Sequence, residues 1–146
     1  MPLKVLQLLS RLEIGGTERA VIRLASRGLQ EGMEHRLLLF DKPFRSEIVD
    51  FDPGVLATEF IQRGPGIDLR FALKLAKKFG DFHLDIVHAH NDTAIFYAAL
   101  AMIIGRYRKL ALIGTFRTWP SHDTTGARLL TRCAAVPVVW TASGEE

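Results

Sequence analysis

A strand-like apolar run leads directly into an amphipathic run near the start of the chain, and this junction constrains the fold most strongly. The first run covers residues 4–9, and the helical pattern begins at Thr17. Between them lie Gly15 and Gly16, which permit a tight turn with strained backbone dihedrals. A strand that turns straight into a helix predicts an α/β fold, and the open helix N-terminus suits an anion. A plain structural turn remains the alternative for the two glycines.

Two charged residues follow the glycines in the first helical turn. The Glu18 carboxylate favours the positive end of the helix dipole, and the Arg19 guanidinium can reach toward a phosphate or an acidic group. Ligands of open α/β sheets bind beyond the carboxyl ends of the strands. Gly15, Gly16, Glu18 and Arg19 are therefore candidates for phosphate or substrate binding.

Apolar runs alternate with helical patterns along the whole chain. The expected strands are residues 4–9, 35–40, 58–61, 84–89, 110–116 and 138–141, and the expected helices are residues 17–29, 68–79, 92–104 and a segment ending at Ala135, with at most a short helix at 47–51. In the first two helices the residues expected to point inward include Val21, Leu24, Ala25, Gly28 and Leu29, then Leu69, Ala72, Leu73 and Ala76. This alternation predicts one domain with a Rossmann-like, doubly wound parallel sheet.

Composition narrows the class of protein. With 146 residues, 48% hydrophobic and 24% charged, the chain is an ordinary globular domain, and its net charge of +3 suits anionic ligands. No basic stripe interleaved with aromatic residues indicates nucleic-acid binding. A single cysteine, Cys133, excludes an intrachain disulfide, so we expect a reducing, cytoplasmic compartment. The apolar stretch 93–104 is too short to span a membrane and predicts a buried helix.

The helix expected at 68–79 has a basic side formed by Arg70, Lys74, Lys77 and Lys78. This side is a candidate for contact with an anionic membrane surface. A solvated lysine face on a crossover helix is the alternative.

A second polar cluster, HAHND, follows the fourth expected strand. His88 and His90 are two residues apart and share a face of an extended strand. We expect His88 to be hydrogen-bonded at the strand end, and His90 and Asn91 to lie in the crevice beyond it. A metal site would need further ligands from His35, His83, His122 or Asp123, and their spacing does not suggest one.

Arg117 follows the fifth strand and belongs to the same sheet edge as Gly15, Gly16, His90 and Asn91 if all strands are parallel. A fixed cation there would hold a phosphate or a developing negative charge, although a surface role is the alternative for a lone loop arginine.

The sequence matches other known nucleotide-binding and hydrolase motifs poorly. A dinucleotide fingerprint needs G-x-G-x-x-G, whereas here the glycines are adjacent; Asp41 nevertheless supplies an acid after the second strand, so an NAD- or FAD-binding domain stays an alternative. The sequence contains neither a P-loop nor a G-x-S-x-G elbow.

Taken together, four segments resemble the N-terminal domain of the family-4, glycogen-synthase-like glycosyltransferases, which are retaining enzymes of GT-B fold. The segments are KVLQLLSRLEIGGTERAVIRLA, DIVHAHND, ALIGTFRTWP and VPVVWTASGEE. They cover the chain from end to end in the expected order. The resemblance implies transfer of a sugar from a nucleotide-sugar donor to a saccharide or lipid-linked acceptor, with retention, as in hexosyltransferases of polysaccharide biosynthesis. It implies no bound metal and no cofactor.

The resemblance also implies roles for single residues. Gly15 and Gly16 would carry the loop that approaches the donor phosphates and the acceptor, supported by Glu18 and Arg19. His90 would lie near the acceptor or the transferred sugar, as a catalytic candidate. Members of the family commonly have histidine where this chain has Arg117, so a guanidinium would meet a charged acceptor or the pyrophosphate there.

The family's main donor-binding machinery belongs to a second Rossmann-like domain, which these residues do not include. We therefore expect residues 1–146 to be a truncated, acceptor-side domain that is inactive alone, with membrane-surface work plausible for the whole enzyme. The rival hypothesis is a non-catalytic Rossmann-like module that binds a nucleotide or a protein.

Overall fold

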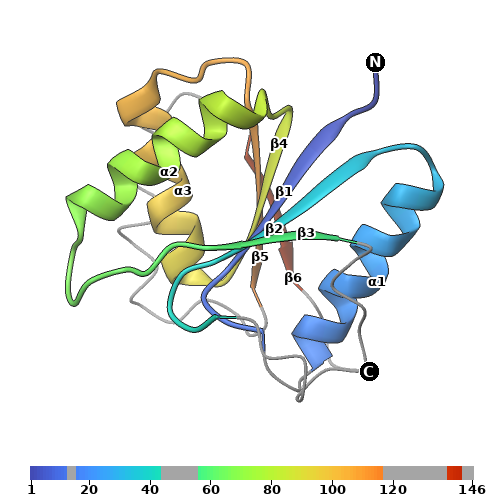
Figure 1. Cartoon of the computed structure of the whole chain (residues 1–146), viewed down its shortest axis with the longest axis horizontal. Helices are drawn as coiled ribbons and strands as arrows, with labels where there is room; N and C mark the ends of the chain where they lie inside the picture. The colour runs from blue at the N-terminus through green and yellow to red at the C-terminus, as the bar shows by residue number, and fades with distance from the viewer. Residues whose placement is uncertain (13–15, 44–55, 117–137, 143–146) are drawn as a thin grey trace.

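The structure is a computed structural model that describes residues 1–12, 16–43, 56–116 and 138–142 (Figure 1). Its elements in chain order are β1 (Lys4–Leu9), α1 (Gly16–Gln30), β2 (Glu34–Leu39), β3 (Ala57–Phe60), α2 (Leu69–Phe82), β4 (Ile86–His90), α3 (Asp92–Gly105), β5 (Ala111–Phe116) and β6 (Val138–Ala142). The described strands and helices therefore follow the predicted order, with boundaries shifted by a few residues. The helices expected at 47–51 and before Ala135 lie outside the described residues.

The six strands form one parallel sheet in the order β3-β2-β1-β4-β5-β6. The chain builds outward from β1 in one direction, returns to the centre, and then builds outward from β4 in the other. This order confirms the doubly wound, Rossmann-like fold. The direction of winding reverses between the neighbouring strands β1 and β4, which is where such sheets bind ligands.

Helices cover both faces of the sheet, with α1 on one side and α2 and α3 on the other (Figure 1). The larger core lies under α2 and α3 and includes Leu6, Leu8, Leu38, Phe40, Val87 and Ala89 from the sheet. The smaller core lies under α1 and includes Leu9, Val21, Ala25, Leu37, Leu39 and Leu56. Two-sided coverage explains why the central strands are nearly continuous apolar runs.

Side-chain caps begin the two helices on the larger core. The Asp68 carboxylate accepts a hydrogen bond from the Phe71 amide at 3.0 Å and caps α2. The Asn91 side-chain oxygen accepts from the Ala94 amide at 2.8 Å and caps α3. Asp and Asn are favoured at these positions because their side chains satisfy the first free N–H groups of a helix.

The inward face of α2 differs from the prediction. Leu69 and Leu73, expected inside, are 59% and 55% exposed, whereas Phe71, Leu75 and Phe79 point into the core. The sequence offers two overlapping apolar faces, and the one that carries two aromatic rings buries more area. Leu24 of α1, also expected inside, is exposed as well.

Membrane-spanning helices were not expected from the sequence. In the part of the chain that the structure describes, no helix combines the length and apolarity needed to cross a bilayer.

Candidate functional site

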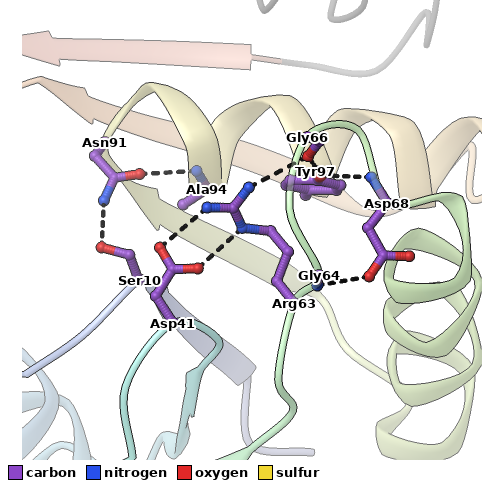
Figure 2. Close-up of polar contacts among 9 residues, drawn as sticks. All are labelled: Ser10, Asp41, Arg63, Gly64, Gly66, Asp68, Asn91, Ala94 and Tyr97. Carbon is purple, nitrogen blue, oxygen red and sulfur yellow. Dashed lines mark hydrogen bonds and ion pairs between the residues drawn. The ribbon is translucent and has the colours of Figure 1, made fainter.

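The carboxyl ends of β1 and β4 are joined by a direct side-chain contact (Figure 2). Ser10 follows β1, and its hydroxyl accepts a hydrogen bond from the Asn91 amide nitrogen at 3.1 Å. Asn91 follows β4 and has a φ of 129° with a ψ of 168°, a strained backbone conformation that is otherwise almost confined to glycine. The two polar atoms of its side chain therefore have separate roles. The oxygen caps α3, and the nitrogen donates to Ser10 across the gap between the ends of β1 and β4.

A second contact fixes the neighbouring strand ends. The Ser10 carbonyl accepts hydrogen bonds from the amides of Phe40, Asp41 and Lys42, of which the Asp41 bond is the shortest at 2.7 Å. This three-amide contact holds the chain after β2 against the chain after β1. Polar groups from both strands therefore share one edge of the sheet.

Arg63, which follows β3, extends this edge through a forked ion pair with Asp41 (Figure 2). Its Nε and Nη2 donate to the two carboxylate oxygens at 2.9 and 3.3 Å. The hydrogen bond that the Arg63 guanidinium donates to Asp41 raises the pKa of Arg63. The guanidinium carbon also lies 5.8 Å from the centre of the Phe40 ring and 5.6 Å from that of Tyr97. The pair leaves the Asp41 side chain 33% exposed, so its carboxylate can still accept hydrogen bonds from a ligand hydroxyl.

Tyr97 of α3 holds the loop between Arg63 and α2 (Figure 2). Its hydroxyl donates to the Gly66 carbonyl at 3.0 Å and accepts from the Asp68 amide at 2.9 Å. Asp68 also accepts from the Gly64 amide at 2.8 Å, and this bond contributes most to lowering the pKa of its carboxyl. A buried aromatic ring thus places an exposed polar loop at the carboxyl edge.

A row of polar side chains crosses the sheet under α1. Gln7 in β1 is fully buried, and its amide oxygen accepts from His90 Nε2 at 2.7 Å while its amide nitrogen donates to His35 Nδ1 at 3.3 Å. His88 Nε2 contacts the Thr115 hydroxyl at 2.7 Å. The His88 and His90 rings lie 3.9 Å apart, which confirms that they share a face. His88 is hydrogen-bonded, as expected.

Burial keeps the three histidines of this row neutral. It lowers the pKa of His90 to about 3, with a smaller contribution from His88, and lowers the pKa of His88 to about 4, with a smaller contribution from His35. Burial also lowers the pKa of His35. Because an amide oxygen only accepts, the contact with Gln7 assigns the His90 proton to Nε2 and leaves Nδ1 as the acceptor.

His90 differs in position from the expectation. It is the last residue of β4, only 6% exposed and packed in the polar row, and does not lie in an open crevice beyond the strand. The residue that does lie beyond the strand is Asn91. The reason is that β4 continues through His90, and its pairing with Thr115 of β5 keeps the side chain on the α1 face.

The phosphate-binding candidates divide into described and undescribed residues. Gly16 is the first residue of α1, Glu18 lies in its first turn, and Arg19 is exposed. Within the described residues the Glu18 Oε2 atom is buried and has no hydrogen-bond partner. Gly15 and Arg117 lie outside the described residues, so the structure does not test whether they join this edge.

Within the described ranges, no group of three or more His, Cys, Asp or Glu side chains could hold a metal ion.

The sequence analysis missed three residues of the site. Arg63 and Tyr97 belong to the carboxyl edge, and Gln7 belongs to the polar row beneath it. Only Gln7 left a signal, because a polar residue inside an apolar strand must have a buried partner.

Comparisons with known proteins agree on this fold. A family model described as Glycosyltransferase Family 4 matches residues 14–142. Among solved structures, the chain is similar to a crystal structure of a glycosyltransferase from Rickettsia africae ESF-5, with a TM-score of 0.65 and 16% sequence identity. The match covers 84% of this chain and 32% of that one, so this chain spans about a third of its length. No curated protein matches significantly.

The family match covers most of the chain, and both halves of the doubly wound sheet fall inside it. The chain therefore belongs to Glycosyltransferase Family 4, and its fold is that of the Rossmann-like N-terminal domain of a GT-B glycosyltransferase.

Proposed function

We propose that this chain is the acceptor-side domain of an enzyme that transfers a sugar from a nucleotide-sugar donor to a saccharide or lipid-linked acceptor with retained configuration. The observation that carries the proposal is the Ser10–Asn91 contact at the switch point of a sheet whose sequence matches a glycosyltransferase family. Hexosyl transfer in polysaccharide biosynthesis, on the cytoplasmic side, is the specific form we propose.

The carboxyl edge offers the groups that a polyhydroxylated acceptor needs. Asn91 and Ser10 provide amide and hydroxyl groups, and Asp41 and Arg63 provide a partly exposed carboxylate and guanidinium. Sugar hydroxyls both donate and accept hydrogen bonds, so a mixed edge of this kind is suitable for them. His90, beneath the edge, contributes a neutral imidazole that cannot repel or attract the acceptor by charge at physiological pH.

Donor phosphates would approach the N-terminus of α1. Backbone N–H groups at the first turn of a helix stabilise a leaving diphosphate, and Gly15 and Gly16 leave room for it. We propose that Glu18 and Arg19 support this turn and that Arg117 meets the pyrophosphate or a charged acceptor. No metal or other cofactor is part of the proposal.

We further propose that a second domain supplies most of the donor site. The similar glycosyltransferase is about three times as long as the segment that this chain covers. The chain alone should then bind nucleotide sugars weakly and transfer no sugar. Sugar transfer by the purified 146-residue chain would contradict this part of the proposal.

Thermal unfolding with added ligands tests the proposal, because a ligand that binds only the folded state raises the midpoint. The ligands are UDP, GDP, ADP and their sugar conjugates, added to this chain and to a longer protein that contains it. We expect one nucleotide series to stabilise the longer protein, and Gly16→Val to weaken the shift. Ala20→Val, an exposed change in the same helix, is the matched control and should leave the shift intact.

The other outcomes separate the rival hypotheses. Stabilisation by NAD or FAD would replace the proposal with a dinucleotide-binding domain. No shift with any nucleotide, in either protein, would favour a non-catalytic module that binds another protein.

A further inference from the structure

Gln7 is the one polar residue in the apolar run 5–9 of β1, and its side chain joins three neighbouring strands. Its amide oxygen accepts from His90 of β4 at 2.7 Å, and its amide nitrogen donates to His35 of β2 at 3.3 Å. The side chain is fully buried. An apolar side chain would fill this position without the cost of burying an amide, so the amide points to a role at its two partners.

The amide determines which ring nitrogen carries the proton in both histidines. Its oxygen only accepts, so His90 carries its proton on Nε2, and its nitrogen only donates, so His35 Nδ1 is bare. Turning the amide over would require the proton of each ring to move to the other nitrogen at the same time. One glutamine therefore holds both rings in the same tautomer.

Second contacts confine the two rings themselves. The His35 ring lies so close to α1 that Gly28 has no room for a Cβ beside Nε2. The His90 ring lies over the His88 ring, with the ring centres 3.9 Å apart, and His88 is held in turn by the Thr115 hydroxyl at 2.7 Å. Neither ring of the row can therefore turn away from the amide without disturbing its neighbours.

His90 is the member of the row that lies nearest to the proposed site, because it ends β4 at the carboxyl edge. Burial lowers its pKa to about 3, so the ring is neutral at physiological pH. With the Nε2 proton given to Gln7, Nδ1 is the ring atom left to accept a hydrogen bond. A sugar hydroxyl can donate one.

We propose that Gln7 is a positioning residue, which holds His90 in the tautomer that accepts a hydrogen bond at Nδ1 from a substrate hydroxyl. Gln7 is fully buried and acts only through His90. The substrate hydroxyl rests on the proposed function, whereas the control of the tautomer by Gln7 does not.

The first test is NMR of the histidine-labelled chain, because long-range proton–nitrogen spectra distinguish a protonated ring nitrogen from a bare one. In the wild type we expect the proton on Nε2 of both His90 and His35. In Gln7→Leu, the Nδ1-protonated form of His90 should become about 10-fold more populated, since the buried Nε2 proton loses its acceptor. A wild-type His90 that carries its proton on Nδ1 would overturn the proposal before any variant is made.

Two further variants separate control of the tautomer from packing. Gln7→Glu keeps an oxygen that accepts from His90, so it should restore the Nε2 proton. Leu6→Met is the matched control, because Leu6 is equally buried in β1 but belongs to the core on the opposite face. Thermal unfolding establishes that each variant is folded. An unchanged tautomer in Gln7→Leu, or an equal change in Leu6→Met, would overturn the proposal.

The second test uses the longer protein and the release of nucleoside diphosphate from the UDP-, GDP- or ADP-sugar that stabilises it. Gln7→Leu should lower kcat/KM about 10-fold in the wild-type background and have no further effect in His90→Leu. Equal losses in both backgrounds would show that Gln7 does not act through His90, and would overturn the proposal. A wild-type protein that released no diphosphate would contradict the proposed function, whereas the role of Gln7 would then be decided by the tautomers.

Discussion

The two faces of the sheet use the same strands for different purposes. On the α2 and α3 face every inward strand residue of the larger core is apolar, and Phe40 packs against Phe71 and Tyr97. On the α1 face the same strands present His35, Gln7, His88 and His90. One face thus provides stability, while the other keeps buried polar groups at the switch point between β1 and β4.

This difference matters because buried polar groups are costly unless every one finds a partner. Gln7 satisfies His90 and His35 together, whereas His35 Nε2 is buried without a hydrogen-bond partner in the described part of the chain. A Cβ at Gly28 of α1 would overlap the His35 ring, so only glycine lets the helix pack this closely. The buried polar groups therefore make the α1 face less stabilising than the opposite face. This cost is consistent with a role for the α1 face beyond packing.

The largest effect should come from the apolar face. Tyr97→Ala removes one of the largest fully buried side chains and the loop contacts at Gly66 and Asp68, and should reduce the free energy of unfolding by about 3–5 kcal/mol. Tyr97→Phe keeps the ring and should cost about 1–2 kcal/mol. Urea unfolding measures both. If the alanine variant cost no more than the phenylalanine variant, the apolar face would not be the main source of stability.

The second largest effect should come from acidification, which lowers the free energy of unfolding through the buried histidines of the α1 face. His88 and His90 have lower pKa values folded than unfolded, so the unfolded state binds more protons below about pH 6.5 and stability falls with pH, down to the folded values of about 4 and 3. Between these pH values, each histidine should lower the free energy of unfolding by about 1.4 kcal/mol for each pH unit of acidification. Urea midpoints from about pH 7 to about pH 5 measure the slope.

Other groups also titrate over this range, so the comparison needs a variant. In His88→Gln, the slope of the free energy of unfolding against pH should be shallower by about the contribution of one histidine. An unchanged slope would mean that His88 is not held neutral by burial.

A smaller effect should follow from changing Gln7. Gln7→Leu leaves the His90 Nε2 proton buried without its acceptor and should cost about 1–3 kcal/mol. Gln7→Leu combined with His90→Leu removes both partners of this hydrogen bond and should recover the part of the loss due to His90, while His35 Nδ1 stays without its donor. A double-mutant cycle by urea unfolding measures the coupling energy. Additive losses would show that the hydrogen bond contributes nothing to the pair.

The smallest effect on stability should occur at the edge itself. Asn91→Ala removes the cap of α3 and should cost about 1 kcal/mol. Asn91→Asp keeps the capping oxygen but replaces the nitrogen that donates to Ser10, so it should cost less in thermal unfolding. The aspartate variant should nevertheless lose acceptor binding in the longer enzyme. Normal binding with normal stability would remove Asn91 from the proposed site.

Sequence patterns predicted the order and type of the elements because apolar runs and helical spacing both act locally. The family resemblance, which is a pattern over the whole chain, is confirmed by the match to residues 14–142. Two of the inward positions predicted for α2, Leu69 and Leu73, were wrong. Leu69 and Phe71 both belong to plausible faces, and only the packing against Phe40 decides between them. The Arg63–Asp41 pair was not predictable, since it joins residues 22 apart through the order of the strands.

We propose that the carboxyl edge between β1 and β4 binds the substrates, while the opposite face provides stability. The most direct test is an NMR titration of the labelled protein with the nucleotide sugar identified by thermal unfolding and with candidate saccharide acceptors. We expect the resonances of Ser10, Asn91 and the first turn of α1 to shift, while those of Phe71 and Phe79 do not. Shifts confined to the α2 and α3 face, with Ser10 and Asn91 unchanged, would contradict it.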